Sequence, residues 1–129
     1  MGALVLVVDD DTDIRETIGS VLEDAGYAVA TAANGEEALR YLRSHDAPKL
    51  ILLDLMMPVM DGIEFRTRQR QDPALARIPV VVISADADHA AAYAARHLAD
   101  FLVKPFKLAA LLEIVSRHCV ATPSETQVP

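Results

Sequence analysis

The stretch LILLDLMMPVMDG, residues 50–62, places a carboxylate at the end of a fully apolar run and follows it at once with a turn. The run from Leu50 to Leu53 lacks period-two alternation, which is typical of a strand buried on both faces. Asp54 ends that run, and Pro58 and Gly62 mark the loop behind it. A carboxylate in this position can cap a loop, bind a metal ion or act as a nucleophile.

Three other apolar runs also end at polar side chains. They are Val5 to Val8 followed by Asp9 and Asp10, Val80 to Ile83 followed by Ser84, and Phe101 to Val103 followed by Lys104 and Pro105. If the four strands lie parallel in one sheet, their carboxyl ends meet at the same edge. That edge would gather three carboxylates, a hydroxyl and an ammonium group, a set suited to a metal ion and a phosphoryl group.

Segments with helical periodicity separate the apolar runs, and this alternation predicts an α/β fold. The expected strands are residues 4–8, 29–32, 50–53, 80–83 and 101–103, and the expected helices are residues 13–25, 63–71, 87–97 and 108–118, with one more helix beginning after Asn34. Right-handed crossovers would join these elements into a doubly wound, five-stranded parallel sheet with five helices. Ligands bind such sheets beyond the carboxyl ends of the strands.

The composition fits one globular domain, since 52% of the 129 residues are hydrophobic. We expect this domain to cover residues 1–120, with a flexible tail or linker at residues 121–129, where Pro, Ser and Thr replace apolar residues. The chain leads straight into its first strand, and no apolar stretch approaches the ~20 residues of a membrane span. We therefore expect a cytoplasmic protein without membrane insertion.

The net charge of -7 argues against direct binding of nucleic acid, whose phosphates require a basic face. The single cysteine, Cys119, offers neither a disulfide framework nor a cysteine metal site. The acidic residues are unevenly placed, because many of them follow shortly after an expected strand. These are Asp9, Asp10, Asp11, Asp13, Asp54, Asp61, Asp86 and Asp88.

Four motifs occur in a characteristic order, and together they are a specific signal. They are Val7-Val8-Asp9-Asp10, Asp54 with Met57-Pro58-Val59-Met60-Asp61-Gly62, Ser84-Ala85, and Lys104-Pro105-Phe106. With them the chain resembles the receiver domains of two-component response regulators, from Leu4 to about Cys119. The resemblance implies a flavodoxin-like sheet with strand order 2-1-3-4-5.

The three carboxylates also indicate a metal site. Asp9, Asp10 and Asp54 at one edge would repel one another unless a cation lay among them. An all-oxygen site with few protein ligands suits Mg²⁺. The resemblance implies that Asp10, Asp54 and the backbone carbonyl of Met56 coordinate Mg²⁺ directly, that Asp9 acts through water, and that Mn²⁺ can substitute.

The resemblance further implies that Asp54 is the phosphoacceptor and becomes an aspartyl phosphate. Lys104 would neutralise charge, Ser84 would bond a phosphoryl oxygen, and a cis bond would join Lys104 to Pro105. Ser84 and Phe101 would then switch the face formed by the fourth helix, the fifth strand and the fifth helix. Phe101 can also be a core residue, an alternative that the sequence leaves open.

The four histidines show no metal-ligand spacing with one another, and we expect them to be solvated. A phosphorylated histidine would then come from a partner protein. By resemblance the partner is a histidine kinase or a histidine phosphotransfer protein. The chain would then catalyse only its own phosphorylation and dephosphorylation. Its output is undetermined by the sequence, and a phosphorylation-dependent dimer is compatible with it. The chain can alternatively be a receiver fragment of a larger regulator whose output domain is missing.

Other functions fit the residues less well. An aspartyl-nucleophile phosphatase of the haloacid dehalogenase type needs a second acid two residues after the nucleophile, where this chain has Met56. A calcium loop that began at Asp9 would need Gly in place of Ile14 and Glu in place of Ser20. We therefore expect Asp11 and Asp13 to be a helix cap and a first-turn charge. A degenerate receiver is disfavoured because every acidic-site residue, Ser84 and Lys104 are present.

The third expected helix departs from good amphipathic form. After Ile63 and Phe65, the run from Arg66 to Arg70 offers little to a hydrophobic core, so we expect the helix to be partly exposed. Its arginines, Arg66, Arg68 and Arg70, can form either a partner-specific face or a solvated one.

Overall fold

Five parallel strands in the order β2-β1-β3-β4-β5 form the sheet, as expected. The computed structural model describes residues 3–57, 59–97 and 99–119. The strands are β1 (Leu4–Val8), β2 (Ala28–Ala32), β3 (Leu50–Asp54), β4 (Val80–Ser84) and β5 (Asp100–Val103), and the helices are α1 (Thr12–Asp24), α2 (Gly35–Ser44), α3 (Gly62–Gln71), α4 (Ala87–His97) and α5 (Leu108–Cys119). Strand and helix alternate throughout, which confirms the α/β fold. The tail expected at residues 121–129 lies outside the described residues.

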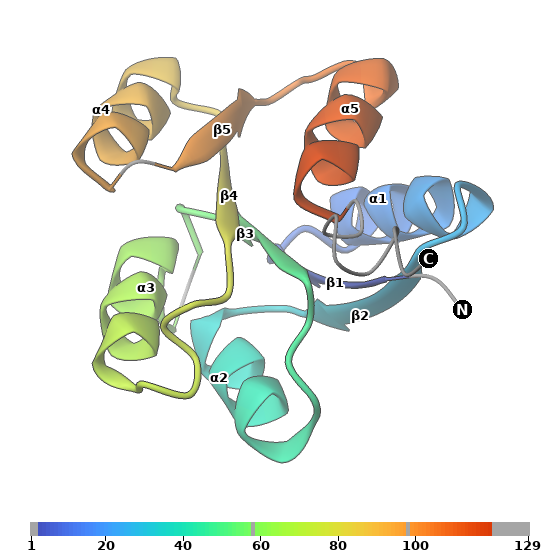
Figure 1. Ribbon diagram of the computed structural model, residues 1–129. Helices are drawn as coiled ribbons and strands as arrows, with labels where there is room; N and C mark the ends of the chain where they lie inside the picture. Colours follow the sequence, from blue (N-terminus) through green and yellow to red (C-terminus); the bar gives the residue numbers. More distant parts are fainter. Residues whose placement is uncertain (1–2, 58, 98, 120–129) are drawn as a thin grey trace, which may run out of the picture.

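The helices cover both faces of the sheet (Figure 1). Successive residues of a strand point to opposite faces, so each strand contributes to two cores. Leu6 and Val8 of β1 pack in a cluster with residues of α2, α3 and α4, whereas Val5 and Val7 pack in a cluster with α1 and α5. Since β1, β3 and β4 are buried on both sides, their sequences are continuous apolar runs rather than alternating ones.

Side-chain caps set where the helices near the carboxyl edge of the sheet begin. Asp11 Oδ1 accepts hydrogen bonds from the backbone N–H groups of Asp13 and Ile14 at the start of α1, as expected. Asp61 Oδ1 accepts from the N–H of Glu64 and begins α3 in the same way. In the described part of the chain, no helix combines the length and the apolar character that a membrane crossing requires.

The expectation that α3 contributes little to the core beyond its first turn was wrong at one residue. Gln69 is fully buried, and its Nε2 donates to the carbonyls of Leu75 and Ile78 at 2.9 and 3.1 Å. These carbonyls belong to the connection between α3 and β4. The Leu75 carbonyl also accepts from the N–H of Ile78 at 3.2 Å, and Gln69 supplies the donor for the Ile78 carbonyl. A polar side chain is therefore buried in this core because its amide donates hydrogen bonds to backbone carbonyls of the neighbouring loop.

Replacing Gln69 with Leu is expected to lower the free energy of unfolding by about 2 kcal/mol, because the buried carbonyl of Ile78 loses its donor and that of Leu75 keeps only the N–H of Ile78. Urea denaturation of the wild type and the variant measures the difference. Gln71→Leu, at an exposed position on the same helix, is the matched control. An equal effect of both substitutions would show that helix propensity or solubility, not the buried amide, sets the loss.

Candidate functional site

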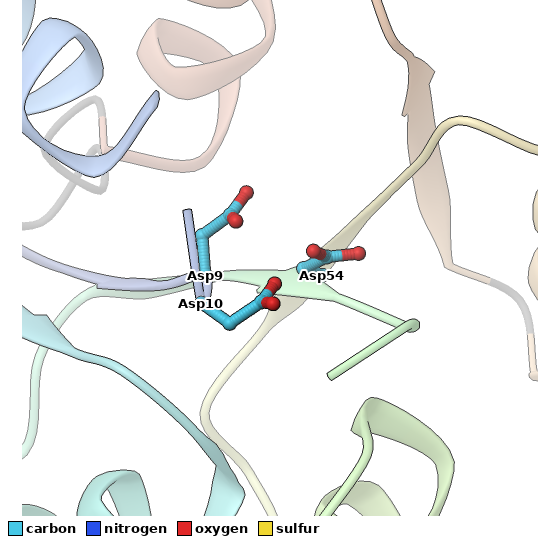
Figure 2. A group of neighbouring side chains, drawn as sticks. All are labelled: Asp9, Asp10 and Asp54. Atoms are coloured by element: carbon cyan, nitrogen blue, oxygen red, sulfur yellow. The ribbon is translucent and has the colours of Figure 1, made fainter. Parts of the chain in front are cut away.

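Three carboxylates meet beyond the ends of two neighbouring strands (Figure 2). Asp9 and Asp10 follow β1, and Asp54 ends β3, which pairs in parallel with β1 so that Val8 lies opposite Leu53. One carboxylate oxygen from each residue lies within 4.8 Å of the others. Asp9 and Asp54 are buried, whereas Asp10 is exposed. The parallel register thus places the predicted acidic residues in one pocket that opens to solvent at Asp10.

Lys104 neutralises the buried part of this pocket. Its Nζ lies 2.8 Å from Asp9 Oδ2 and 3.2 Å from Asp54 Oδ2. Its backbone N–H donates to the carbonyl of Ser84 at 2.9 Å, which ties the end of β5 to the end of β4. Burial lowers the pKa of Lys104, but its close ion pair with Asp9 and its attraction to Asp54 outweigh burial and raise the pKa overall. The Lys104–Pro105 peptide bond is cis.

The pocket alters the titration of the Asp54 carboxylate. Burial raises its pKa from 3.8 to about 6. A hydrogen bond from the N–H of Met56, 3.0 Å from Asp54 Oδ1, opposes this change, and so does the charge of Lys104, whereas Asp9 adds to it. The Asp54 carboxylate is therefore mostly ionised at neutral pH, yet its charge is poorly solvated.

This shift predicts that Asp54→Asn stabilises the metal-free protein at alkaline pH. The folded state binds the Asp54 proton more tightly than the unfolded chain, so the free energy of unfolding falls as pH rises from 3.8 to about 6. Asparagine removes this penalty, and we expect the variant to be more stable than the wild type by about 2–3 kcal/mol at about pH 7.5 and equal to it at about pH 4.

Urea denaturation in the presence of a chelator measures this difference at the two pH values. Asp86→Asn is the control, because Asp86 is exposed at the same edge and asparagine caps a helix as well as aspartate does. A stability difference between Asp54→Asn and the wild type that did not change with pH would contradict the prediction.

The donor set fits a hard divalent cation such as Mg²⁺. All three side chains offer oxygen, and their spacing allows one ion to contact more than one of them. Asp9 Oδ2 is buried and accepts no hydrogen bond of good geometry, although Lys104 Nζ lies close to it. A buried carboxylate oxygen with spare acceptor capacity beside two other carboxylates is typical of a cation site.

The two expected switch residues lie on the adjoining strands. Ser84 ends β4, next to Ile83, which lies opposite Asp54 in the register. It is buried, and its Oγ accepts a hydrogen bond from the N–H of Asp86 at 3.1 Å. Phe101 on the edge strand β5 is 38% exposed, so it is not a core residue in this structure.

Three structural features that hold the pocket in place were not predicted from the sequence. Arg15 Nη1 donates to the backbone carbonyl of Asp9 at 2.7 Å, which fixes the end of β1. Val59 adopts a φ of 67°, an uncommon angle for a β-branched residue, in the loop after Asp54. At Gly62, a Cβ atom would lie 2.5 Å from the carbonyl oxygen of Asp54. Of the three, only Gly62 could have been predicted, because a glycine at the end of the motif that follows Asp54 can indicate a close approach of the backbone.

A family model described as the response regulator receiver domain matches residues 5–116. Among curated proteins, an uncharacterised 14.6 kDa protein of Leptolyngbya boryana is 37% identical over 123 residues, which are 94% of this chain and 93% of that protein. Among solved structures, the chemotaxis response regulator CheY4 of Vibrio cholerae has a TM-score of 0.81 and 34% identity and covers 91% of this chain and 98% of its own.

The response regulator TrrA of Thermotoga maritima, solved in complex with Mg²⁺ and BeF, has a TM-score of 0.78 and 30% identity over 89% of this chain and 97% of its own. Several other curated relatives are longer proteins. The chain spans between 35% and 57% of their length, and some of them are transcriptional regulators.

Proposed function

The chain belongs to the response regulator receiver domain family, and we propose that it accepts a phosphoryl group on Asp54 from a phosphohistidine of a partner protein. As a receiver domain it is a signalling module of two-component systems rather than an enzyme. The observation that carries the proposal is the position of Asp54, buried beside Asp9 and Asp10 and 3.2 Å from the Lys104 ammonium.

The proposed transfer follows from the state of the Asp54 carboxylate. An oxygen of Asp54 attacks the phosphorus atom in line, a P–O bond forms, and the P–N bond to the partner's imidazole breaks. With a pKa of about 6, the Asp54 carboxylate is largely ionised at neutral pH and can attack. Lys104 is already in contact with Asp54 and balances the negative charge that the phosphoryl group brings.

We assign a divalent cation, Mg²⁺ or Mn²⁺, to the same pocket. Asp10, Asp54 and the backbone carbonyl of Met56 would hold it, and Asp9 would act through water. Bound there, the cation neutralises phosphoryl oxygens and the carboxylates together. The Asp10 side chain is exposed, so the pocket is open on the side from which a phosphoryl donor can approach.

Ser84 and Phe101 are proposed to turn the phosphoryl group into a signal. The Ser84 hydroxyl can rotate from its bond with the N–H of Asp86 toward a phosphoryl oxygen. Phe101, which lies exposed on β5, would follow by a change of rotamer. The equilibrium between the inactive and active conformations of the face formed by α4, β5 and α5 would then shift. This face would then contact an output partner, a second copy of the chain, or an output domain.

The proposed donor is a histidine kinase or a histidine phosphotransfer protein. The alternative proposal is that the chain is the receiver part of a larger regulator, and it is supported by the longer relatives of which the chain spans less than half. The haloacid dehalogenase alternative receives no support, because Met56 stands where that chemistry needs an acid.

Incubation with acetyl phosphate and Mg²⁺, followed by intact mass measurement, tests the phosphoacceptor assignment. We expect one phosphoryl adduct on the wild type, no adduct without the cation, and no adduct on Asp54→Ala. Asp61→Ala, at a neighbouring acid that caps α3, is the control and should still be phosphorylated. An adduct of equal abundance on Asp54→Ala, or none on the wild type, would refute the assignment.

A further inference from the structure

A groove of about 410 Å³ is lined by residues of α3 and by Tyr93 of α4. It offers hydrogen-bond donors of several kinds, namely two guanidinium groups, an amide and a phenol. The Thr67 hydroxyl in its lining already donates to the Ile63 carbonyl at 3.0 Å. Its lining residues are Ile63, Arg66, Thr67, Arg70, Gln71 and Tyr93, and none of these described residues carries a carboxylate. On a chain with a net charge of -7, the groove is a local site of positive charge.

The Arg66 guanidinium is fixed before any ligand arrives. Its Nη1 donates to Gln69 Oε1 at 2.7 Å, and Gln69 is fully buried and anchored on the carbonyls of Leu75 and Ile78. Arg66 is only half-buried, but its Nε is buried and has no hydrogen-bond partner among the described residues. A side chain held by a buried network loses little conformational freedom on binding, so the groove is pre-organised for an acceptor.

Like charges are crowded in the groove. Arg66 and Arg70 are one helical turn apart, an arrangement that is unfavourable for two cations. Burial lowers the pKa of Arg66, the Tyr93 phenol opposes that change, and the charge of Arg70 adds to it. Arg68, between them in the sequence, does not line the groove and pairs with Glu64 at 3.0 Å. An anion between Arg66 and Arg70 would relieve their repulsion.

We propose that this groove, which we call the α3–α4 anion groove, binds a small phosphate-bearing molecule. Guanidinium groups bind phosphate oxygens with two parallel hydrogen bonds, and the groove supplies two such groups with additional neutral donors. The ligand class comprises free phosphates and the phosphate groups of a nucleotide. The site does not depend on the proposed phosphoacceptor, because Asp9, Asp54 and Lys104 do not line it.

Titration of the ¹⁵N-labelled, metal-free protein with pyrophosphate at constant ionic strength tests the proposal. We expect saturable shifts of the Thr67 and Tyr93 amide signals, which persist in Asp54→Asn. Arg66→Gln and Arg70→Gln should each raise the Kd about tenfold or more, the loss expected for one charged hydrogen-bonding partner. Arg68→Gln removes the same charge from the same helix and should change the Kd by less than about twofold.

The nature of the ligand follows from parallel titrations with AMP and adenosine. If AMP and pyrophosphate bind and adenosine does not, the groove recognises the phosphate group. If adenosine binds as tightly as AMP, that assignment is wrong. Equal weakening by all three arginine variants would reveal nonspecific attraction and sink the proposal, as would the absence of saturable shifts near the groove. If the Arg66→Gln variant does not fold, two other variants still test the proposal: Arg70→Gln, at an exposed position, and Arg66→Lys, which keeps the positive charge.

Discussion

Lys104→Met is expected to lower the free energy of unfolding of the metal-free protein by about 3–5 kcal/mol at about pH 7.5, the loss typical of a buried ion pair that loses one partner. The Lys104 ammonium lies 2.8 Å from Asp9 and 3.2 Å from Asp54, and both carboxylates are buried. Methionine has a similar volume but no charge, so the variant leaves two like charges together. Urea denaturation with a chelator present measures the loss.

Three comparisons make the Lys104 result specific. Lys107→Met removes an exposed lysine three residues away and should change stability by less than about 0.5 kcal/mol. At about pH 5 the loss in Lys104→Met should shrink, because Asp54 takes up a proton there. Added Mg²⁺ should also restore part of the stability. If the loss were the same at both pH values and with the cation, Lys104 would be acting through its packing alone.

Gly62→Ala is expected to have the second large effect, a loss of about 3 kcal/mol or more in stability together with slower phosphorylation. The added Cβ would lie 2.5 Å from the carbonyl oxygen of Asp54 and 2.8 Å from the Cα of Leu55. Both are backbone atoms, so they cannot rotate away as a side chain can. The β3–α3 loop must shift, and the Asp54 carboxylate shifts with it.

Gly19→Ala is the matched control for Gly62→Ala. Gly19 lies inside α1, and its nearest neighbour to an added Cβ is Val29 Cγ1 at 3.7 Å, an ordinary contact. Alanine favours a helix interior over glycine, so this variant should be as stable as the wild type or more stable by about 0.5–1 kcal/mol. Thermal melting and the rate of adduct formation from acetyl phosphate measure both effects. If Gly62→Ala left both the melting temperature and the rate of adduct formation unchanged, the β3–α3 loop would be able to shift without a cost in stability, which would contradict the prediction.

The architecture was predictable because the strands are buried on both faces. Such strands are apolar without interruption, and the first polar residue therefore marks the carboxyl end, as Asp9 and Asp54 do. Parallel strands bring these ends to one edge, so the meeting of the acids followed from the sequence pattern. Strand boundaries were correct to within one residue. The strand order, by contrast, came from the family resemblance and not from the apolar pattern.

The features that the sequence did not reveal depend on how the loops at the ends of the strands and helices fold. The sequence predicts that Gln69 is a solvent-exposed helix residue. Its burial is explained only by the path of the following loop, which brings the Ile78 carbonyl to its amide. The bond from Arg15 to the Asp9 carbonyl joins the start of α1 to the end of β1, and its geometry depends on the loop between them. The positive φ of Val59 contradicts the local preference of a β-branched residue, which makes it unpredictable from propensity.

The central claim is that the carboxylate of Asp54 carries the phosphoryl group. Reduction of the acetyl phosphate-treated protein with borohydride, followed by peptide mass mapping, tests it most directly, because borohydride converts an acyl phosphate to an alcohol and leaves a free carboxylate intact. The account predicts homoserine in place of aspartate at residue 54, only in the sample that received both acetyl phosphate and Mg²⁺. Homoserine at Asp9 or Asp10 instead, or a phosphoryl group on a serine, threonine or histidine, would contradict it.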